Sequence, residues 1–267
     1  MAELNPRLCN FICVGNSDGY TMIYSRITDM FNYLKPDGTL LYKRFFKYVY
    51  PFENGFARVL CEEGLNFLTH EGKLLSNLYF EEAEDFYNGF ARVRYKNRWN
   101  FLKEDGTFIP VNEEFVDMGD FFEGFARGAN SQGRWNYINE EGKTISKVWF
   151  FNAFDFDNGF GTVETEDHTF NFITPNGELL CKENFSDTPG FTPDGVALIE
   201  RFDGTYNFVK SDGTILGDRD YENASEFEDG IAVVRLDHKY NYLKLDGSYL
   251  FEEWREKELP SLPIELF

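Results

Sequence analysis

The chain has 267 residues, of which 18% are aromatic, and its formal net charge is −20. A field of this sign repels phosphate backbones and anionic bilayers, so the composition argues against nucleic acid and membrane surfaces as partners. No stretch approaches the run of about 20 apolar residues that spans a bilayer. The length is ample for a buried core, and aromatic side chains, 30 of them Phe, must form much of it.

The N-terminal residues 1–6 contain no basic stretch followed by an apolar core, and so show no secretory signal. This predicts a cytoplasmic protein, or a secreted one if a signal peptide has been removed. The four cysteines share no repeat position, which favours reduced, mostly buried thiols over a disulfide or zinc framework; they are Cys9, Cys13, Cys61 and Cys181.

One pattern recurs seven times along the chain. A Gly opens a short apolar run, a second run is centred on Asn, and an acidic residue or Asn followed by Gly ends it. A fixed period of this length is typical of a repeat architecture. Residues 18–23 are the weakest copy. The central Asn recurs every 34 to 36 residues and the turn Gly follows six residues later, at Asn32, Asn66, Asn100, Asn136, Asn171, Asn207 and Asn241, and at Gly38, Gly72, Gly106, Gly142, Gly177, Gly213 and Gly247.

Each copy predicts short strands separated by tight turns. The first run, such as residues 56–59, is apolar and bounded by turn residues, and the second, such as residues 99–102, alternates; both are typical of strands. Asp-Gly and Asn-Gly then favour a tight hairpin, and the apolar pair after it, such as residues 74–75, is predicted as a third strand. The connecting segment has apolar residues three apart, as in residues 80–86, and fits either a helical turn or a bulged fourth strand.

These elements predict an all-β chain of seven tandem antiparallel hairpin or meander repeats of about 35 residues. The units cover residues 1–250 and end near residues 41, 75, 109, 145, 180, 216 and 250, and residues 251–267 are expected to form a cap or tail. An open superhelical array is favoured, because a propeller blade usually takes about 40 to 50 residues. The alternative is a closed, seven-bladed, propeller-like ring in which the segment from Asn10 to Gly15 completes the last unit.

The sequences Arg-Trp-Asn-Phe-Leu at residues 98–102 and Arg-Trp-Asn-Tyr-Ile at residues 134–138, with the glycines around them, resemble the WG repeat, also called the KWG repeat. That repeat is common in bacterial proteins, and the resemblance covers roughly residues 10–250. One departure recurs: every copy has Asn where the family usually has Gly after Trp, and Trp itself is present only at Trp99 and Trp135. The resemblance implies a repeat fold and implies no catalytic residues.

Residues suited to metal binding or catalysis are few. His70, His168 and His238 each lie near a turn but at different repeat positions, so they are predicted as turn residues rather than as a ligand set. The Asp-Gly turns offer one or two carboxylates beside a Lys, whereas Ca²⁺ takes about six to eight oxygen ligands. We therefore expect no catalytic residue, no metal site and no cofactor.

The central Asn is the one polar residue that every copy keeps. Its amide could bridge its own hairpin or the neighbouring repeat and satisfy backbone groups there. This predicts a structural role, with a ligand-facing row of amides as the alternative.

Arginine and tryptophan are the best candidates for a binding surface. Arg58, Arg92 and Arg127 lie two residues after an aromatic residue at equivalent positions of three repeats. They form either a row of arginines with solvated ends and packed stems, which is favoured, or a recognition strip. Trp149 and Trp254 are further candidates for exposed binding residues.

Three functions of different class are consistent with these patterns. We expect a non-catalytic module that binds or scaffolds another protein, because repeat arrays present extended surfaces. Carbohydrate binding through exposed aromatic residues is the alternative, with a glycan as partner. An enzyme whose site is assembled from Asp, Glu and His across repeats is less favoured.

Overall fold

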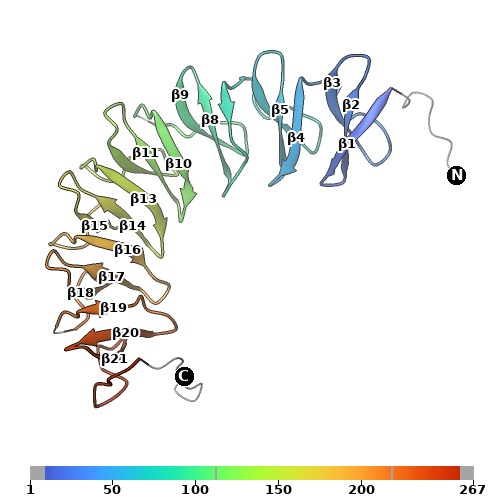
Figure 1. Cartoon of the computed structure of the whole chain (residues 1–267). Helices are drawn as coiled ribbons and strands as arrows, with labels where there is room; N and C mark the ends of the chain where they lie inside the picture. The colour runs from blue at the N-terminus through green and yellow to red at the C-terminus, as the bar shows by residue number, and fades with distance from the viewer. Residues whose placement is uncertain (1–9, 112, 218, 259–267) are drawn as a thin grey trace. The chain divides into compact units, whose positions relative to one another are not determined.

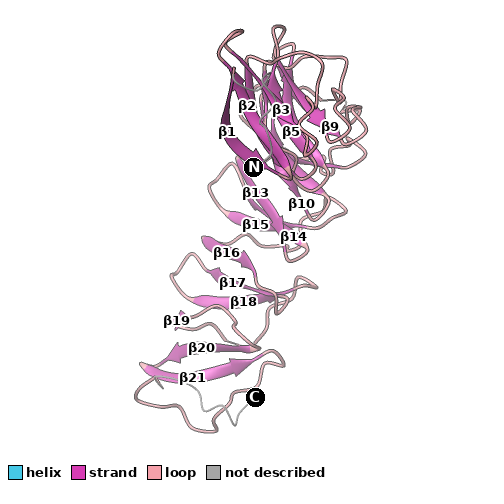
Figure 2. Ribbon diagram, turned by 90° about the vertical axis from the view of Figure 1, so that its right-hand side faces the viewer, coloured by secondary structure: helices cyan, strands magenta, loops and turns pink. Residues whose placement is uncertain are grey.

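The structure, a computed structural model, describes residues 10–111, 113–217 and 219–258. Within these ranges the chain forms 21 strands joined by turns and loops, with no helix (Figure 2). None of the described residues therefore belongs to a helix able to cross a membrane. Residues 1–6, Cys9 and the end of the predicted tail lie outside the described residues.

The strands form seven antiparallel sheets, each built from three strands that are consecutive in the chain (Figure 1). This confirms the prediction of an all-β chain of seven tandem units. The sheets are β1 (Phe11–Ser17), β2 (Tyr20–Ser25) and β3 (Met30–Leu34); β4 (Tyr48–Glu53), β5 (Phe56–Leu60) and β6 (Leu65–Thr69); β7 (Glu82–Ala83), β8 (Phe90–Tyr95) and β9 (Arg98–Lys103); β10 (Asp117–Phe122), β11 (Phe125–Ala129) and β12 (Trp135–Asn139); β13 (Asn152–Asp157), β14 (Phe160–Glu164) and β15 (Phe170–Ile173); β16 (Asp187–Phe191), β17 (Val196–Glu200) and β18 (Tyr206–Lys210); and β19 (Asn223–Ala224), β20 (Ile231–Leu236) and β21 (Lys239–Lys244).

The weakest copy of the repeat also forms a complete sheet. Its strand β1 pairs with β2, which in turn pairs with β3. The segment from Asn10 to Gly15, on which the ring alternative depended, thus supplies a strand to the first sheet.

The identity of the third strand in each unit differs from the prediction. The apolar pair after the Asp-Gly turn makes only an isolated bridge, such as Leu68 with Leu74, so the prediction of a strand there is wrong. The connecting segment supplies the strand instead, and it is bulged: in β4, Val49 pairs with Val59 and Phe52 pairs with Ala57. A bulge places two residues opposite one, which breaks the alternation and spaces the buried residues three apart.

Two kinds of turn join the strands. The opening glycine lies in a two-residue turn such as Asn54-Gly55, where both residues have positive φ, 49° and 89°. This is the conformation that matches the twist of a two-residue hairpin, and Gly and Asn adopt it at low cost. The second turn contains the Asp-Gly pair; the Gly213 amide donates to the Lys210 carbonyl at 2.8 Å.

Contacts between residues divide the chain into two compact units, residues 1–121 with 140–143, and residues 122–139 with 144–267. In the first unit the core contains Val49, Phe52 and Val59 of the second sheet. In the second unit it contains Phe172 of β15 together with Phe191 and Ile199 of the sixth sheet. The apolar faces of neighbouring sheets therefore cover each other within each unit, as repeats that cannot bury a face alone require.

Candidate functional site

Six of the seven central Asn residues are buried, and the seventh, Asn100, is half-buried. Asn66 has no exposed surface. Its Nδ2 donates to the carbonyls of Ser76 and Leu78, each at 2.9 Å, and its Oδ1 accepts from the Phe67 amide at 2.7 Å and the Ser76 amide at 3.3 Å. The side chain thus fixes the chain that leaves the hairpin towards the next repeat. Asn32, Asn136 and Asn171 make the same kind of contacts.

The turn aspartates use their carboxylates locally. Asp212 Oδ1 accepts from the Thr214 amide at 2.9 Å and from its hydroxyl at 2.6 Å. The hydroxyl bond and then the amide bond hold the pKa of Asp212 below its usual value. The same arrangement recurs at Asp37, Asp105 and Asp246. The described residues contain no group of His, Cys, Asp and Glu side chains placed to hold a metal ion.

The three histidines lie at separate places. His70 Nε2 is 2.7 Å from Asp18 Oδ2, and its ring stacks on Tyr20. His168 Nδ1 is 2.7 Å from Glu164, and His238 contacts Glu222. Each His therefore has its own carboxylate partner.

The tryptophans do not gather in one place either. Trp254 packs edge-on against Tyr249, with ring centroids 5.1 Å apart, beside the core of the last sheet. Its neighbour Arg255 exchanges backbone hydrogen bonds with Tyr240 at 2.8 Å. Trp254 and Arg255 therefore contact the last sheet. Trp149 is half-buried in the loop that precedes β13.

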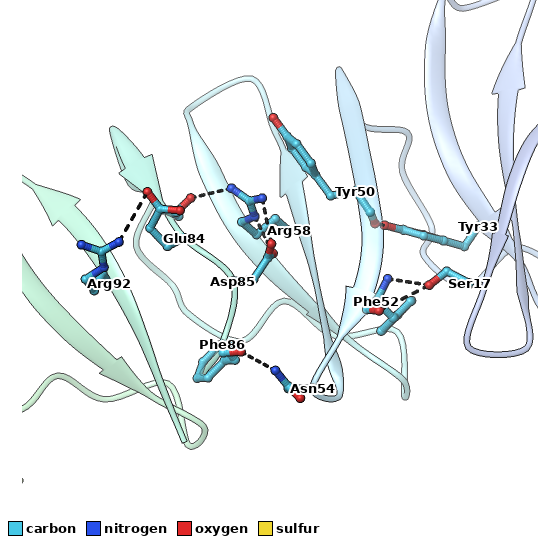
Figure 3. A network of polar contacts seen from close by, with 11 residues as sticks. Ser17, Tyr33, Tyr50, Phe52, Asn54, Arg58, Glu84, Asp85, Phe86 and Arg92 are labelled. Carbon is cyan, nitrogen blue, oxygen red and sulfur yellow. Dashed lines mark hydrogen bonds and ion pairs between the residues drawn. The ribbon is translucent and has the colours of Figure 1, made fainter. Parts of the chain in front are cut away.

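The three arginines each contact the repeat that follows, as Arg58 does between the second and third repeats (Figure 3). Arg58 Nε and Nη2 donate to the two carboxylate oxygens of Asp85 at 2.6 and 2.9 Å, and its Nη1 donates to the Ala83 carbonyl at 2.8 Å. Arg92 Nε is 2.8 Å from Asp120 Oδ1, and Arg127 Nε is 2.9 Å from Asp155 Oδ1. These guanidinium groups are thus partly buried, and each is paired with a carboxylate of the following repeat.

Two of these guanidinium groups also lie against an aromatic ring of their own sheet. The Arg58 guanidinium lies 4.4 Å above the ring centroid of Tyr50, on β4. The Arg127 guanidinium lies 5.4 Å from that of Trp135, on β12. Attraction between a guanidinium and an aromatic face adds to the ion pair at each place.

Two further rows of contacts run between neighbouring repeats. The aromatic residue after the opening Gly stacks on a Phe of the following sheet, as Phe56 does on Phe86 at a centroid distance of 4.2 Å. The turn Asn before that Gly donates to the carbonyl of the same Phe, as Asn54 does at 2.6 Å. Phe160 and Asn158 repeat both contacts with Phe191, at 4.1 and 2.8 Å. The fifth and sixth sheets therefore stack in the same register as the second and third.

The arginine row ends before these two sheets. Thr162 lies three residues after its opening Gly, in the place of Arg58, Arg92 and Arg127. Gly190 immediately precedes the stacked Phe191, in the place of Asp85, Asp120 and Asp155. Both members of the ion pair are thus missing together, and a Cβ placed on Gly190 would lie 3.5 Å from the Thr162 hydroxyl.

A hollow of about 450 Å³ occupies this place. Its walls come from the first strands of the two sheets, and its remaining surface from β14 and β15. The lining residues are Phe154, Asp155, Asp157, Phe160, Thr162, Phe170 and the five residues of β16.

The hollow is acidic and aromatic, and none of its lining residues is cationic. Asp155 is paired with Arg127, whereas Asp157 and Asp187 are exposed and form no ion pair with any described residue. Phe154 is 43% exposed.

One wall is held in place by Tyr137, whose hydroxyl lies 2.5 Å from the Phe154 carbonyl and 2.9 Å from the Thr162 carbonyl. Burial raises the pKa of Tyr137, so the hydroxyl stays protonated and able to donate.

Comparison with known proteins bears on the repeat itself. A family model described as WG containing repeat matches residues 33–63, 67–99 and 208–240. The chain therefore contains WG repeats at these three positions. The matched WG repeats include Arg58 and Arg92 but not the hollow. No curated protein sequence matches the chain.

Among solved structures, the WG-repeat chain is similar to BamB from Moraxella catarrhalis, with 12% identity, coverage of 88% of this chain and 82% of that chain, and a TM-score of 0.33. It is also similar to the WD40 β-propeller domain of Doa1 (15% identity, 83% and 87% coverage, TM-score 0.30). The C-terminal WD40 domain of Sif2 gives 11% identity, 88% and 78% coverage and a TM-score of 0.32. Likeness at this level says nothing about what the chain binds.

Sequence reasoning missed the acidic partners of the arginines. Asp85, Asp120 and Asp155 follow Arg58, Arg92 and Arg127 by 27 or 28 residues, and the same spacing from Thr162 leads to Gly190. Aligning the acidic residues along with the basic ones would have shown that the pair is lost as a unit. The hollow that this loss leaves depends on packing, and only the structure reveals it.

Proposed function

We propose that this WG-repeat chain is a non-catalytic module that binds another protein through the hollow between its fifth and sixth sheets. The observation that carries the proposal is that the hollow combines exposed aromatic surface with two exposed carboxylates, Asp157 and Asp187, that form no ion pair with any described residue. A partly apolar depression with a few polar groups is the usual form of a recognition site.

The other recurring residues of the repeat are already in contact with the chain itself, which supports the choice of the hollow as the binding surface. The central Asn, the opening aromatic residue and the arginines all bind groups of their own or the next repeat, as at Asn66, Phe56 and Arg58. They hold the array together and leave little for a partner. The hollow is where one of these rows stops.

The carboxylates of the Asp-Gly turns are suited to a structural role. A general acid at neutral pH needs a carboxyl whose pKa is raised. The shifts at Asp37, Asp105 and Asp212 go the other way, because hydroxyl and amide groups of the turn stabilise the charged form. These carboxylates are suited to building hairpins.

We further propose that the protein acts in the cytoplasm. Its described cysteines support this, because Cys13, Cys61 and Cys181 are unbridged thiols. Thiols persist where the surroundings are reducing. Burial raises the pKa of Cys61 and Cys181 to about 11, which keeps both unreactive.

A peptide-selection experiment tests the proposed function. A random peptide library displayed on phage is selected against the full chain, and the affinity of the recovered peptides is measured by fluorescence anisotropy. Phe154→Ser should weaken binding by about tenfold or more, as expected when an aromatic contact of an interface is removed. Phe202→Ser is the matched control, because Phe202 is 68% exposed and does not line the hollow.

The proposal fails if no peptide of any composition is recovered. It also fails if the two Phe variants bind the recovered peptides equally well, because binding would then not involve the hollow. Parallel anisotropy measurements with labelled oligosaccharides test the carbohydrate alternative. Oligosaccharide binding in the absence of peptide binding would replace the proposed function.

A further inference from the structure

The hollow keeps most of the groups that bind a guanidinium elsewhere in the chain. Phe154 lies two residues before its stacked Phe, as Tyr50 does, and Tyr50 lies under the Arg58 guanidinium. Phe170 directly precedes its central Asn, as Trp135 does, and Trp135 faces the Arg127 guanidinium. Both aromatic supports are therefore present around Thr162, where the arginine is missing.

The polar side of the arginine site is also represented. In the second repeat Arg58 donates to the Ala83 carbonyl, three residues before the stacked Phe. The residue at that position of the sixth sheet is Thr188, in the wall of the hollow. Gly190 supplies no carboxylate where three other repeats have Asp. Asp157 and Asp187 line the same space and carry the same negative charge.

We propose that the hollow receives the arginine side chain of a basic peptide segment of a partner protein. This inference rests on the proposed function and specifies its ligand. The incoming guanidinium takes the place that the chain's own arginine takes in repeats two to four, with Phe154 and Phe170 against its faces and carboxylates at its edge. The chain's net charge of −20 favours the approach of a basic segment.

Arginine suits the hollow better than lysine for a physical reason. A planar guanidinium stacks on an aromatic ring and donates to a carboxylate and a carbonyl at once, whereas an ammonium is a compact, strongly hydrated charge. Arg58 and Arg127 bind in this way at the equivalent positions, and Arg92 makes the contacts with a carboxylate and a carbonyl. The internal repeats thus indicate the chemistry of the ligand, and acidity alone would not.

Two charge-matched peptides test the inference. Both are fluorescently labelled, ten residues long and of net charge +3; one carries a single Arg and two Lys, and the other carries three Lys. Anisotropy with the full chain at physiological salt should give an affinity about fivefold or more higher for the peptide with Arg. Excess L-arginine amide should displace it better than excess L-lysine amide does.

One variant fills the hollow from inside. Thr162→Arg adds a guanidinium at the place of the missing one and should reduce the affinity for the Arg peptide to that for the Lys peptide. Leu198→Arg is the matched control: it adds the same charge at the same repeat position of the next sheet, outside the lining of the hollow. The control should keep the fivefold preference. Circular dichroism and thermal unfolding establish that both variants fold.

Equal affinities for the two peptides would overturn the inference, and so would an equal effect of the two Arg substitutions, because either result means that only net charge matters. Binding of L-arginine amide as tight as that of the peptide would also overturn it in favour of a small-molecule ligand. Selected peptides that bind the hollow without any Arg would refute this inference and leave the proposed function standing. The recovery of no peptide would remove both.

Discussion

The ion pair between Arg58 and Asp85 should contribute measurably to holding the second and third repeats together. Its test is a double-mutant cycle with Arg58→Met, which keeps an unbranched apolar stem, and Asp85→Ala. The two side chains make two nitrogen–oxygen contacts of 2.6 and 2.9 Å. Their exposed fractions are 19% and 37%.

The expected magnitude follows from this geometry. Two unit charges about 4 Å apart interact by about 1 kcal/mol in water and about 4 kcal/mol at an effective dielectric constant of about 20. Because Asp85 is more than one-third exposed, solvent screens the pair and the lower part of this range applies. We expect a coupling free energy of about 1–2 kcal/mol. Arg58→Met alone should cost more, because it also removes the bond to the Ala83 carbonyl and the contact with Tyr50.

The coupling is obtained from urea unfolding of the wild type, the two single variants and the double variant, with hydrogen exchange of β5 and β7 as a local probe. The matched control is the same cycle at Arg98 and Glu114, an ion pair whose side chains are 62% and 66% exposed. That pair should couple by less than about 0.5 kcal/mol. Equal coupling at the two pairs would refute the reasoning that the arginine row stabilises the stacking of repeats.

Two other perturbations test the hairpins. Asn66→Leu should lower the stability by about 2–4 kcal/mol, because it leaves buried backbone groups without partners. Thermal unfolding should show a loss of several degrees. The control Asn77→Leu, at an exposed position, should change the stability little, and equal losses would contradict the structural role of Asn66. Thr214→Val should raise the pKa of Asp212, measured by NMR titration, towards 3.8. Because the pKa is lowered in the folded state, the hydrogen bond contributes stability above about pH 3.8, and this contribution is lost as pH falls through the folded-state pKa. The variant should therefore lose less stability than the wild type in that pH range. An unchanged pKa would show that the hydroxyl does not stabilise the carboxylate.

The sequence predicts the period and the hairpins well because both depend on local chemistry. Glycines such as Gly55 and Gly213 adopt positive φ, and their positions can be counted along the chain. The fold class follows from these positions and the alternating runs between them. Most strands can therefore be predicted from the sequence alone.

The connecting strands were harder to predict, because a bulge destroys the signal that identifies a strand. Val49 and Phe52 lie on the two sides of the bulge in β4 and are three residues apart, which resembles the spacing of a helical turn. Most of the apolar residues after the Asp-Gly turn are buried or half-buried and so resemble a strand, yet Leu74 makes only a single bridge. Burial without extended pairing misled the interpretation there.

The candidate site could be predicted only in part. Arg58 and Asp85 are 27 residues apart, and only the stacking of sheets shows that they meet. The loss of both partners at Thr162 and Gly190 can be read from an alignment of the repeats. Whether neighbouring side chains then fill the space depends on their packing, so the hollow itself had to come from the structure.

A crystal structure of the chain bound to the ten-residue peptide with a single Arg would test the central claim most directly. The account predicts that the peptide's guanidinium lies in the hollow against the rings of Phe154 and Phe170, with a carboxylate of Asp157 or Asp187 within hydrogen-bonding distance. A peptide bound elsewhere on the acidic surface, with the hollow filled by solvent, would contradict the account.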